Sequence, residues 1–314
     1  MPGKSYHNCS MFFAVCLFFL LATGCGDQQQ HEKKANEPPG AAQSQKLKIG
    51  LISEYDIFSQ KKSYEPLAAY LAKKTGTTIE LSMFSRYGNL IDNFAPNGLD
   101  GAFFGSFAAA LAIRKLAIQP LARPEYPNGA STYHGLIFVR KDSPIREGAD
   151  MRGKRFALVD KASTAGWLLP MHYFKENAIE DYRTFFSETY FTGTHEDAVY
   201  DVLHGKADIG AAKNTVFDHL AESDSKVREE LQILEISPEM PANALAVRRD
   251  LDESLKQKLK NALLRMDQDP EGKTVLRAFG AGKFIAATPK DYDPVFDYAD
   301  KIGLDPATYD YINE

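Results

Sequence analysis

The sequence predicts an α/β protein of two lobes, each a mainly parallel β-sheet flanked by helices. Strand-like and helix-like segments alternate along most of the chain, and the connections between them are short. This pattern is typical of parallel strands joined by crossover helices. The stretch from Lys46 to Glu314 is also longer than a usual single lobe, and two lobes accommodate it.

The first alternating series runs from residue 46 to residue 115. Its strand-like segments are apolar and β-branched, and its helical segments show apolar residues at helical spacing. Gly76 ends the first helix of the series. The series predicts strands over 46–53, 77–84 and 99–105, and helices over 64–76, 87–95 and 106–115.

A second series begins near residue 155 and predicts a second sheet. The chain then returns through apolar segments at 231–236 and 243–250 to three C-terminal helices, of which 253–269 is the clearest. We therefore assign residues 46–135 with 242–314 to lobe 1 and 136–241 to lobe 2, with crossovers near 133–139 and 236–247. The second series comprises strands over 155–160, 184–191 and 207–214, and helices over 164–177, 195–205 and 216–223.

The N-terminus indicates export. Lys4 precedes an apolar run of about a dozen residues, which is too short to span a bilayer and is typical of a signal peptide over 1–24. The run ends in LATGC, which resembles the lipobox of bacterial lipoproteins, with Ala22 at the place usually held by Leu. That resemblance implies a lipid on Cys25. Residues 25–45 have little to bury and predict a flexible tether.

Cysteine usage agrees with an extracytoplasmic location. The three cysteines, Cys9, Cys16 and Cys25, lie at or before the expected cleavage point, so the folded part has no thiol. The sequence also contains no H-E-x-x-H, no G-x-S-x-G and no His, Cys or carboxylate cluster at metal spacing. These observations predict no metal, no cofactor and no enzymatic activity.

The charge balance excludes a nucleic-acid partner. The chain has 37 Lys and Arg residues against 42 Asp and Glu residues, a net charge of -5 and a pI near 5.9. Because the overall field does not attract anions, any bound anion must be held by local dipoles and hydrogen bonds.

Polar turns follow several of the predicted strands. In open α/β sheets, ligands bind at the carboxyl ends of the strands, where helix N-termini point. The turns are rich in Ser, Thr, Gly, Tyr, His or Asn, and carboxylates do not dominate any of them, which predicts a cleft lined with hydrogen-bond donors. They are 85–88, 104–107, 162–166, 192–197 and 213–215.

Each turn also has a purely structural interpretation. Ser163 and Thr164 could cap a helix, or their turn could cradle an oxyanion. Thr194 and Asp197 form a capping-box variant, on which view His195 is a first-turn surface residue. Tyr87 and Tyr133 could be ordinary half-buried aromatics. Their shared position at strand ends favours a binding site.

Longer motifs resemble one family. The segments SRYG, LDGAFFG, TYHGLIFVRKDSPI, DMRGKRFALVDKASTAGWLLP and TGTHEDAVYDVLHGKADIGAA occur in the order and spacing of the periplasmic phosphate, phosphite and phosphonate-binding proteins of ABC importers. The resemblance covers most of 46–251. It implies the type II periplasmic-binding-protein fold, a hinged clamp, and capture of a small phosphorus oxyanion for an inner-membrane ABC permease.

The resemblance also implies which residues bind the ligand. The Ser-Thr-x-Gly turn would hold phosphoryl oxygens, with Ala165 where the family commonly has Ser. Members that take aminoalkyl phosphonates hold the ammonium with two acids, and the matching positions here are Thr215 and Asn243, with Lys213 close by. An ammonium would find no countercharge there, so the expected ligand carries no amine. The implied binding residues are Tyr87, Tyr133, Ser163, Thr164, Ala165, His195, Thr215 and Asn243.

Two further expectations concern mechanism and partners. His195 is expected to bind an anion best when charged, so affinity should fall as pH rises through its titration range. The protein is expected to be a monomer in the cell envelope, attached to the membrane through its lipid. Two alternatives stay open: the same fold serving a sensor kinase, and an enzyme acting on a phosphorylated small molecule.

Overall fold

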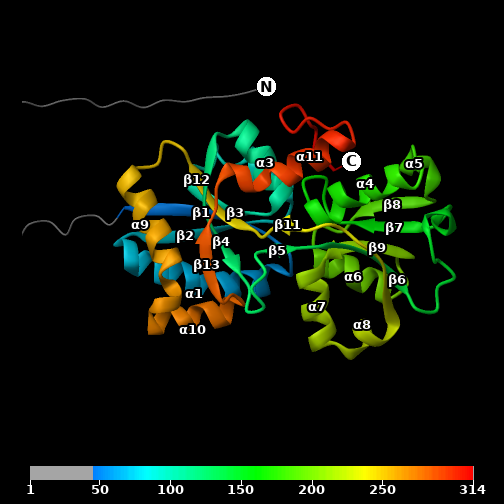
Figure 1. Cartoon of the computed structure of the whole chain (residues 1–314), viewed down its shortest axis with the longest axis horizontal. Coiled ribbons are helices and arrows are strands. Elements are labelled where there is room, and N and C mark those ends of the chain that lie inside the picture. The colour runs from blue at the N-terminus through cyan, green and yellow to red at the C-terminus, as the bar shows by residue number, and fades with distance from the viewer. Residues whose placement is uncertain (1–44, 314) are drawn as a thin grey trace, which may run out of the picture. The chain divides into compact units, whose positions relative to one another are not determined.

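The computed structural model describes residues 45–313, which form two β-sheets with helices on both faces (Figure 1). The signal peptide, Cys25 and nearly all of the tether lie outside the described residues. Among those that are described, no helix is both long and apolar enough to cross a membrane.

The first sheet has six strands and defines lobe 1. The strands are β1 (Lys46–Ile52), β2 (Thr78–Phe84), β3 (Gly101–Phe104), β4 (Ile118–Glu125), β12 (Ala244–Arg248) and β13 (Lys283–Ala286). Their order is β13-β4-β12-β3-β1-β2. β1 is parallel to β2 and β3, while β12 is antiparallel to β3 and β4, and β13 is antiparallel to β4. Four of the six strands therefore point the same way.

The second sheet has five strands and defines lobe 2. They are β6 (Gly135–Arg140), β7 (Arg155–Leu158), β8 (Glu188–Phe191), β9 (Ile209–Lys213) and β10 (Leu231–Ile236), in the order β10-β6-β9-β7-β8. β7 is parallel to β8 and β9, and β6 is antiparallel to β9 and β10. Here one strand, β6, opposes the other four, and the two sheets confirm the prediction that both are mainly parallel.

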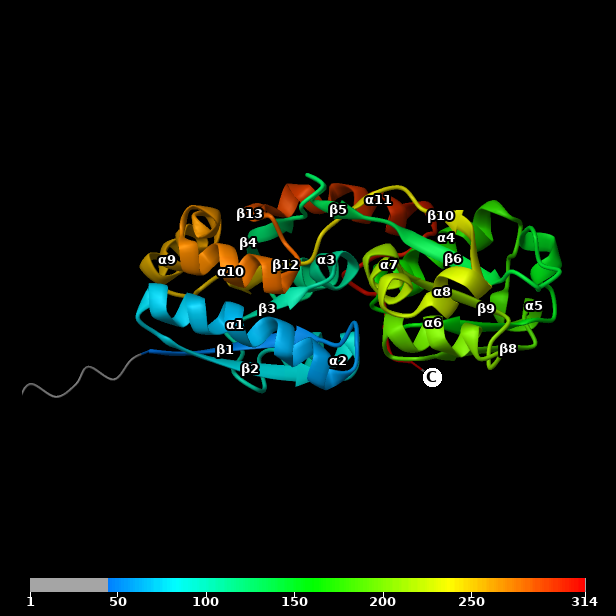
Figure 2. The same ribbon diagram turned by 90° about the horizontal axis from the view of Figure 1, so that it is seen from below.

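Apolar helix faces cover both sides of each sheet (Figure 2). Lobe 1 carries α1 (Ile57–Thr75), α2 (Tyr87–Asp92), α3 (Ser106–Lys115), α9 (Glu253–Leu264), α10 (Pro270–Phe279), α11 (Asp293–Lys301) and the 3-10 turns Met266–Gln268 and Pro289–Tyr292. Lobe 2 carries α4 (Leu169–Glu176), α5 (Tyr182–Phe185), α6 (His195–Leu203), α7 (Asn214–Ser223), α8 (Ser225–Glu230), the 3-10 turn Gly148–Met151 and the π-helical turn Thr164–Leu168.

Helix α3 is the element that lies deepest. Its residues Ser106–Ala112 are all buried, because a run of alanines lets other elements approach the helix backbone closely. It contacts α2, α11 and the π-helical turn of lobe 2. The N-terminus of α3 is therefore held where the lobes meet.

Two crossing segments and the C-terminus connect the lobes. The segments pair with each other as a short antiparallel ribbon of β5 (Thr132–Tyr133) and β11 (Met240–Pro241). Beyond α11, the Asn313 side chain accepts from the Lys161 amide at 2.9 Å and donates to Asp160 at 2.9 Å. The last residues of the chain therefore bind to lobe 2.

The structure differs from the sequence expectations at a few elements. Strands β4 and β13 were not predicted, and α1 begins seven residues before the expected start at residue 64. Asp56 caps this longer helix, because its carboxylate accepts from the amides of Phe58 and Ser59. The early start brings α1 close to the end of β1, where the candidate site lies.

Candidate functional site

Buried polar side chains gather where the two lobes meet, at the carboxyl ends of β1, β3, β7 and β9. A soluble protein buries such groups only when they are hydrogen-bonded or paired, so a cluster of them needs a specific explanation. We call this set the interlobe cluster. It comprises Glu54, Tyr87, Ser106, Tyr133, Ser163, Thr164, His195, Lys213 and Asn243.

An ion pair between the lobes lies within the cluster. Lys213 ends β9 in lobe 2, and its Nζ lies 2.9 Å from Oε1 of Glu54, just after β1 in lobe 1. Asn243 bridges the two: its Oδ1 accepts from Lys213 Nζ at 3.2 Å and its Nδ2 donates to Glu54 Oε1 at 3.1 Å. The Lys213 ammonium also lies 4.6 Å from the ring centre of Tyr133, a cation-π distance.

Both members of this pair are charged. Burial raises the pKa of Glu54, but Lys213, His195 and two hydrogen bonds outweigh it and hold the pKa below its usual value. Burial lowers the pKa of Lys213, and the Glu54 carboxylate overcomes this and raises it well above its usual value. The interlobe cluster therefore contains a fixed positive charge with its own counter-ion.

His195 is buried and neutral. Its Nδ1 accepts a hydrogen bond from the backbone amide of Lys213 at 3.2 Å, so the proton is on Nε2. Burial lowers its pKa to about 4, with Lys213 adding to the decrease and Glu54 opposing it. The expectation of a charged His195 is therefore wrong, and so is its placement on a helix surface. It can serve as a neutral N–H donor.

Tyr133 connects the ion pair to the turn at Thr164. Its hydroxyl lies 2.9 Å from Ser106 Oγ and also interacts with the Thr164 side chain. Thr164 Oγ1 in turn accepts from the backbone amide of Phe107 across the lobe boundary at 2.8 Å. Ser106 Oγ donates to the Pro241 carbonyl, so it accepts from the Tyr133 hydroxyl. The Thr164 hydroxyl is therefore the donor in its interaction with Tyr133.

The turn at Ser163 is both a helix cap and a donor. Ser163 Oγ accepts from the Gly166 amide at 3.0 Å, which is the capping interaction. In the described part of the chain, the amides of Thr164 and Ala165 donate to no protein acceptor. The wide π-helical turn leaves these N–H groups without intrahelical partners. The helix cap is therefore confirmed, and two amides of the same turn have no protein acceptor.

Tyr87 has a buried hydroxyl without a partner among the described residues. The side chain is only 2% exposed, and its ring meets that of His195 edge to face at 6.1 Å. Leaving a buried hydroxyl unpaired costs free energy, so such a group indicates a missing hydrogen-bond partner. Tyr87 is therefore the clearest sign that something polar belongs beside His195.

At three of the five predicted turns, backbone amides donate to protein acceptors. The Tyr87 amide donates to Asp160, the Phe107 amide to Thr164, and the amides of His195 and Glu196 to the Glu54 carbonyl. In each case the acceptor belongs to the other lobe. The lobes lie in contact, so these amides of the expected donor-lined cleft are satisfied by protein atoms of the opposite lobe.

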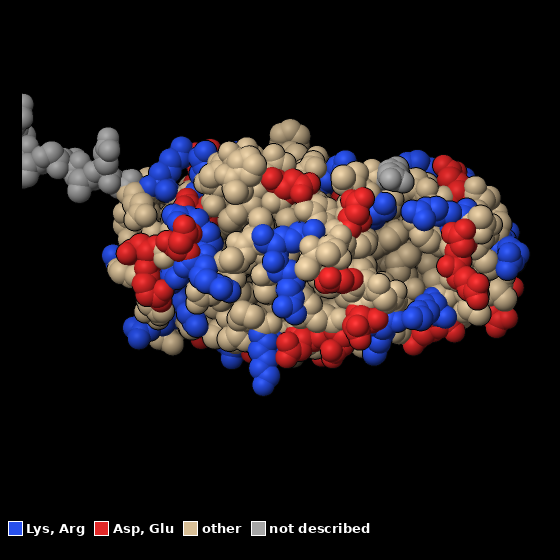
Figure 3. Space-filling view, turned by 90° about the horizontal axis from the view of Figure 1, so that it is seen from above, with Lys and Arg blue, Asp and Glu red and all other residues tan. Residues whose placement is uncertain are grey.

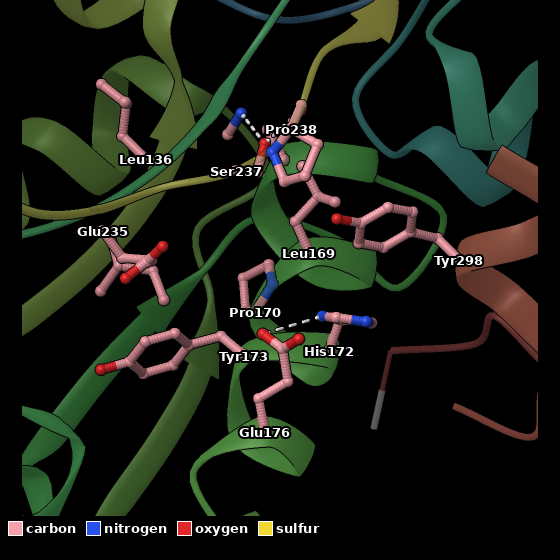
Figure 4. Close-up of a pocket in the computed structure, with 13 residues that line it drawn as sticks. Leu136, Leu169, Pro170, His172, Tyr173, Glu176, Glu235, Ser237, Pro238 and Tyr298 are labelled. Carbon is pink, nitrogen blue, oxygen red and sulfur yellow. Dashed lines mark hydrogen bonds and ion pairs between the residues drawn. The ribbon is translucent and has the colours of Figure 1, made fainter. Parts of the chain in front are cut away.

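Thr215 and the Ala165 side chain lie outside the interlobe cluster. Thr215 lines an open groove between the lobes, which Glu54, Lys213 and Asn243 also line. Ala165 packs beside Gly135 and Leu169 and lines a second pocket. Figure 4 shows that pocket, with Pro170 and the His172–Glu176 pair from α4 below Pro238 of the crossover and Tyr298 of α11 beside them. The sequence expectation that no countercharge lies near Asn243 is wrong, because Glu54 is there.

Sequence reasoning missed Glu54 and Asp160, and it included Ser106 and Lys213 only within the turns 104–107 and 213–215, without assigning them as binding residues. Each of the four lies at or just beyond the end of a predicted strand, which is the signal that could have found them. Asp160 is fully buried, and burial raises its pKa, while donors from Ala162, Asn313 and Tyr87 oppose that shift. It holds the turn at Ser163 against α2.

The surface charge does not mark the site. Figure 3 shows one face of the molecule, on which Lys and Arg side chains are interspersed with Asp and Glu side chains without one dominant patch. Within the described residues, no group of three or more His, Cys, Asp or Glu side chains is placed to hold a metal ion. The candidate site is therefore defined by the buried polar groups of the interlobe cluster.

The comparisons with known proteins agree on one family. Residues 49–292 match the family model described as "ABC transporter, phosphonate, periplasmic substrate-binding protein". A phosphonates-binding periplasmic protein of Escherichia coli (strain K12) is 28% identical over 258 residues, covering 81% of this chain and 75% of that protein. A phosphate-import protein of Mycolicibacterium smegmatis is 27% identical over 227 residues, covering 69% of this chain and 68% of that one.

A solved structure confirms the two-lobed fold. The Prochlorococcus marinus (MIT 9301) protein in complex with methylphosphonate superposes with a TM-score of 0.74 at 21% identity, covering 82% of this chain and 98% of that one. Together with the family match, this likeness confirms the predicted two-lobed periplasmic-binding-protein fold.

Gly166 should be required for the geometry of the Ser163 turn. A Cβ at this position would lie 2.3 Å from Val159 Cβ and 3.0 Å from Ser163 Oγ. We expect Gly166→Ala to lower the free energy of unfolding by about 1–3 kcal/mol through overpacking, measured by denaturant unfolding. Gly105→Ala is the matched control, because its Cβ would meet nothing closer than 3.6 Å. Equal effects of the two substitutions would contradict the prediction.

His195 should make stability depend on pH in a defined window. Its pKa is about 4 in the folded protein against an ordinary value of 6.5, so the unfolded chain binds more protons between these values. His195 therefore contributes about 3 kcal/mol to the free energy of unfolding above pH 6.5, and this contribution is lost as pH falls toward 4. We expect His195→Gln to reduce the change in stability between pH 4 and 6.5, and His204→Gln to leave that change as in the wild type. Thermal unfolding measured from pH 4 to 8 tests this.

Proposed function

Because the chain belongs to the periplasmic substrate-binding proteins of phosphonate ABC transporters, we propose that it captures a small phosphorus oxyanion between its lobes. Phosphate, phosphite and simple alkylphosphonates are the candidate ligands, since the relatives named above bind or import phosphonates, phosphate or methylphosphonate. The observation that carries the proposal is the unpaired Tyr87 hydroxyl, together with the free amides of the Thr164 turn.

Each donor has a specific role in this proposal. The amides of Thr164 and Ala165, with the hydroxyl of Ser163, hold oxygens of the ligand from lobe 2. The Nε2–H of neutral His195 holds another from the same lobe. Tyr87 donates from lobe 1. A ligand held by both lobes stabilises their contact, which is how a clamp of this fold reports that it is loaded.

Hydrogen bonds alone can supply the free energy of ligand binding, so a net positive surface is not required. A hydrogen bond to a charged group contributes about 1.5–3 kcal/mol, so four or five of them reach micromolar affinity or better after the cost of closing. Closing costs little here, because the lobes already contact each other through the Lys213–Glu54 pair and several backbone amides.

The proposal extends to cellular context. It places the protein at the extracytoplasmic face, anchored by a lipid on Cys25 at the end of a 1–24 signal peptide, as a monomer delivering its ligand to an ABC permease. The lobe limits proposed are 46–135 with 242–314 and 136–241, moving about the β5–β11 ribbon. Thr215 and Asn243 border the ligand from the groove side, and no catalytic step is proposed.

The Tyr87 hydroxyl provides a specific test. We expect methylphosphonate, phosphite or phosphate to raise the thermal unfolding temperature of the purified full chain, and Tyr87→Phe to weaken the best ligand about 10- to 100-fold, measured by calorimetry. Tyr292→Phe is the matched control, since Tyr292 also has a buried hydroxyl without a partner in the described structure but lies outside the interlobe cluster. Failure of every phosphorus oxyanion to bind the wild-type protein would refute the proposed function.

The pH dependence of binding gives a second check. Because His195 is neutral well above pH 4, its titration should not weaken binding between about pH 5 and 8, once the ligand's own ionisation is subtracted. A loss of affinity that follows a group of pKa near 6.5 and disappears in His195→Gln would contradict the assigned protonation state.

A further inference from the structure

Lys213 places an ammonium group inside the interlobe cleft. The side chain is 4% exposed, and Nζ contacts Glu54 Oε1 at 2.9 Å, Asn243 Oδ1 at 3.2 Å and the face of the Tyr133 ring at 4.6 Å. A carboxylate, an amide oxygen and an aromatic face are the groups that proteins use to recognise an alkylammonium ion. Glu54, Asn243 and Tyr133 therefore form a cation subsite that the protein fills with its own side chain.

This subsite adjoins the groups that hold the oxyanion under the proposed function, on which the inference rests. The Lys213 backbone donates to His195, and the Tyr133 hydroxyl interacts with Thr164. The subsite also borders the open groove between the lobes, because Glu54, Lys213 and Asn243 line that groove. A substituent on a bound phosphonate can therefore reach the subsite, and small cations can enter it from solvent.

We infer that Lys213 is a specificity-determining residue, which excludes aminoalkyl phosphonates by occupying the cation subsite with its own ammonium. A ligand amine would meet the Lys213 charge and would have no free counter-ion, since Glu54 is already paired. A neutral alkyl group of the same length meets no such repulsion. Removing the lysine ammonium frees the Glu54 carboxylate and lets a ligand supply the cation instead.

A purely structural role makes a different prediction. If the Lys213–Glu54 pair only stabilised contact between the lobes, its removal would weaken all ligands by a similar factor. Under the specificity role, removal changes the ratio between an amine and its neutral analogue. The matched ligand pair is 2-aminoethylphosphonate and propylphosphonate, which differ by an ammonium in place of a terminal methyl.

The experiment measures both affinities by calorimetry in four proteins. We expect the wild type to bind propylphosphonate at least about tenfold more tightly than 2-aminoethylphosphonate, and Lys213→Ala to reverse this preference. Lys213→Ala/Glu54→Gln should lose the gained amine binding, because the carboxylate is gone. Lys213→Gln, which retains a donor for Glu54, should reduce the discrimination and serves as the test if Lys213→Ala does not fold.

A second readout does not depend on phosphonate binding. Methylammonium should raise the unfolding temperature of Lys213→Ala by filling the vacated subsite, with no effect on the wild type or on the double variant. A wild type that binds both phosphonates equally, or a Lys213 variant with an unchanged ratio, would overturn the inference and leave the proposed function intact. Absence of any phosphonate, phosphite or phosphate binding would overturn both.

Discussion

The buried ion pair between Lys213 and Glu54 determines how the two lobes meet. Each partner lies at the end of a strand in a different sheet, and each would be costly to bury without the other. Asn243 satisfies a remaining hydrogen-bonding position on both. The backbone around Glu54 contributes as well, because its carbonyl accepts from the first amides of α6. One contact thus aligns β1, β9 and α6 across the interlobe boundary.

The protonation state of His195 follows from this arrangement. The Lys213 amide occupies its Nδ1, and the burial produced by lobe contact disfavours its charged form. His195, which is expected from the sequence to attract an anion by its charge, is therefore a neutral N–H donor. The positive charge in the cluster belongs to Lys213 instead, and the Glu54 carboxylate is its counter-ion. Under the proposed function, ligand binding depends on oriented N–H and O–H groups more than on net charge.

The contact between lobes also explains why several corner amides are satisfied by protein. Asp160, Thr164 and the Glu54 carbonyl each accept from the opposite lobe. Donors without a protein acceptor in the described structure include the amides of Thr164 and Ala165 and the Tyr87 hydroxyl. A buried cluster with all but a few donors paired is specific, since only an acceptor of the right shape completes it.

The sequence by itself determined the α/β class, the two mainly parallel sheets and the residues that end their strands. Hydrophobic periodicity and turn residues depend on neighbours along the chain, so both can be recognised from the sequence alone. The cap at Ser163 and the helix at 106–115 are examples. Only the tertiary structure decided which strand ends face each other. Glu54 lies 159 residues from Lys213 along the chain, so no local pattern in the sequence reveals that the two pair. Burial, and with it the neutrality of His195 and the orphaned Tyr87 hydroxyl, exists only once the lobes are in contact.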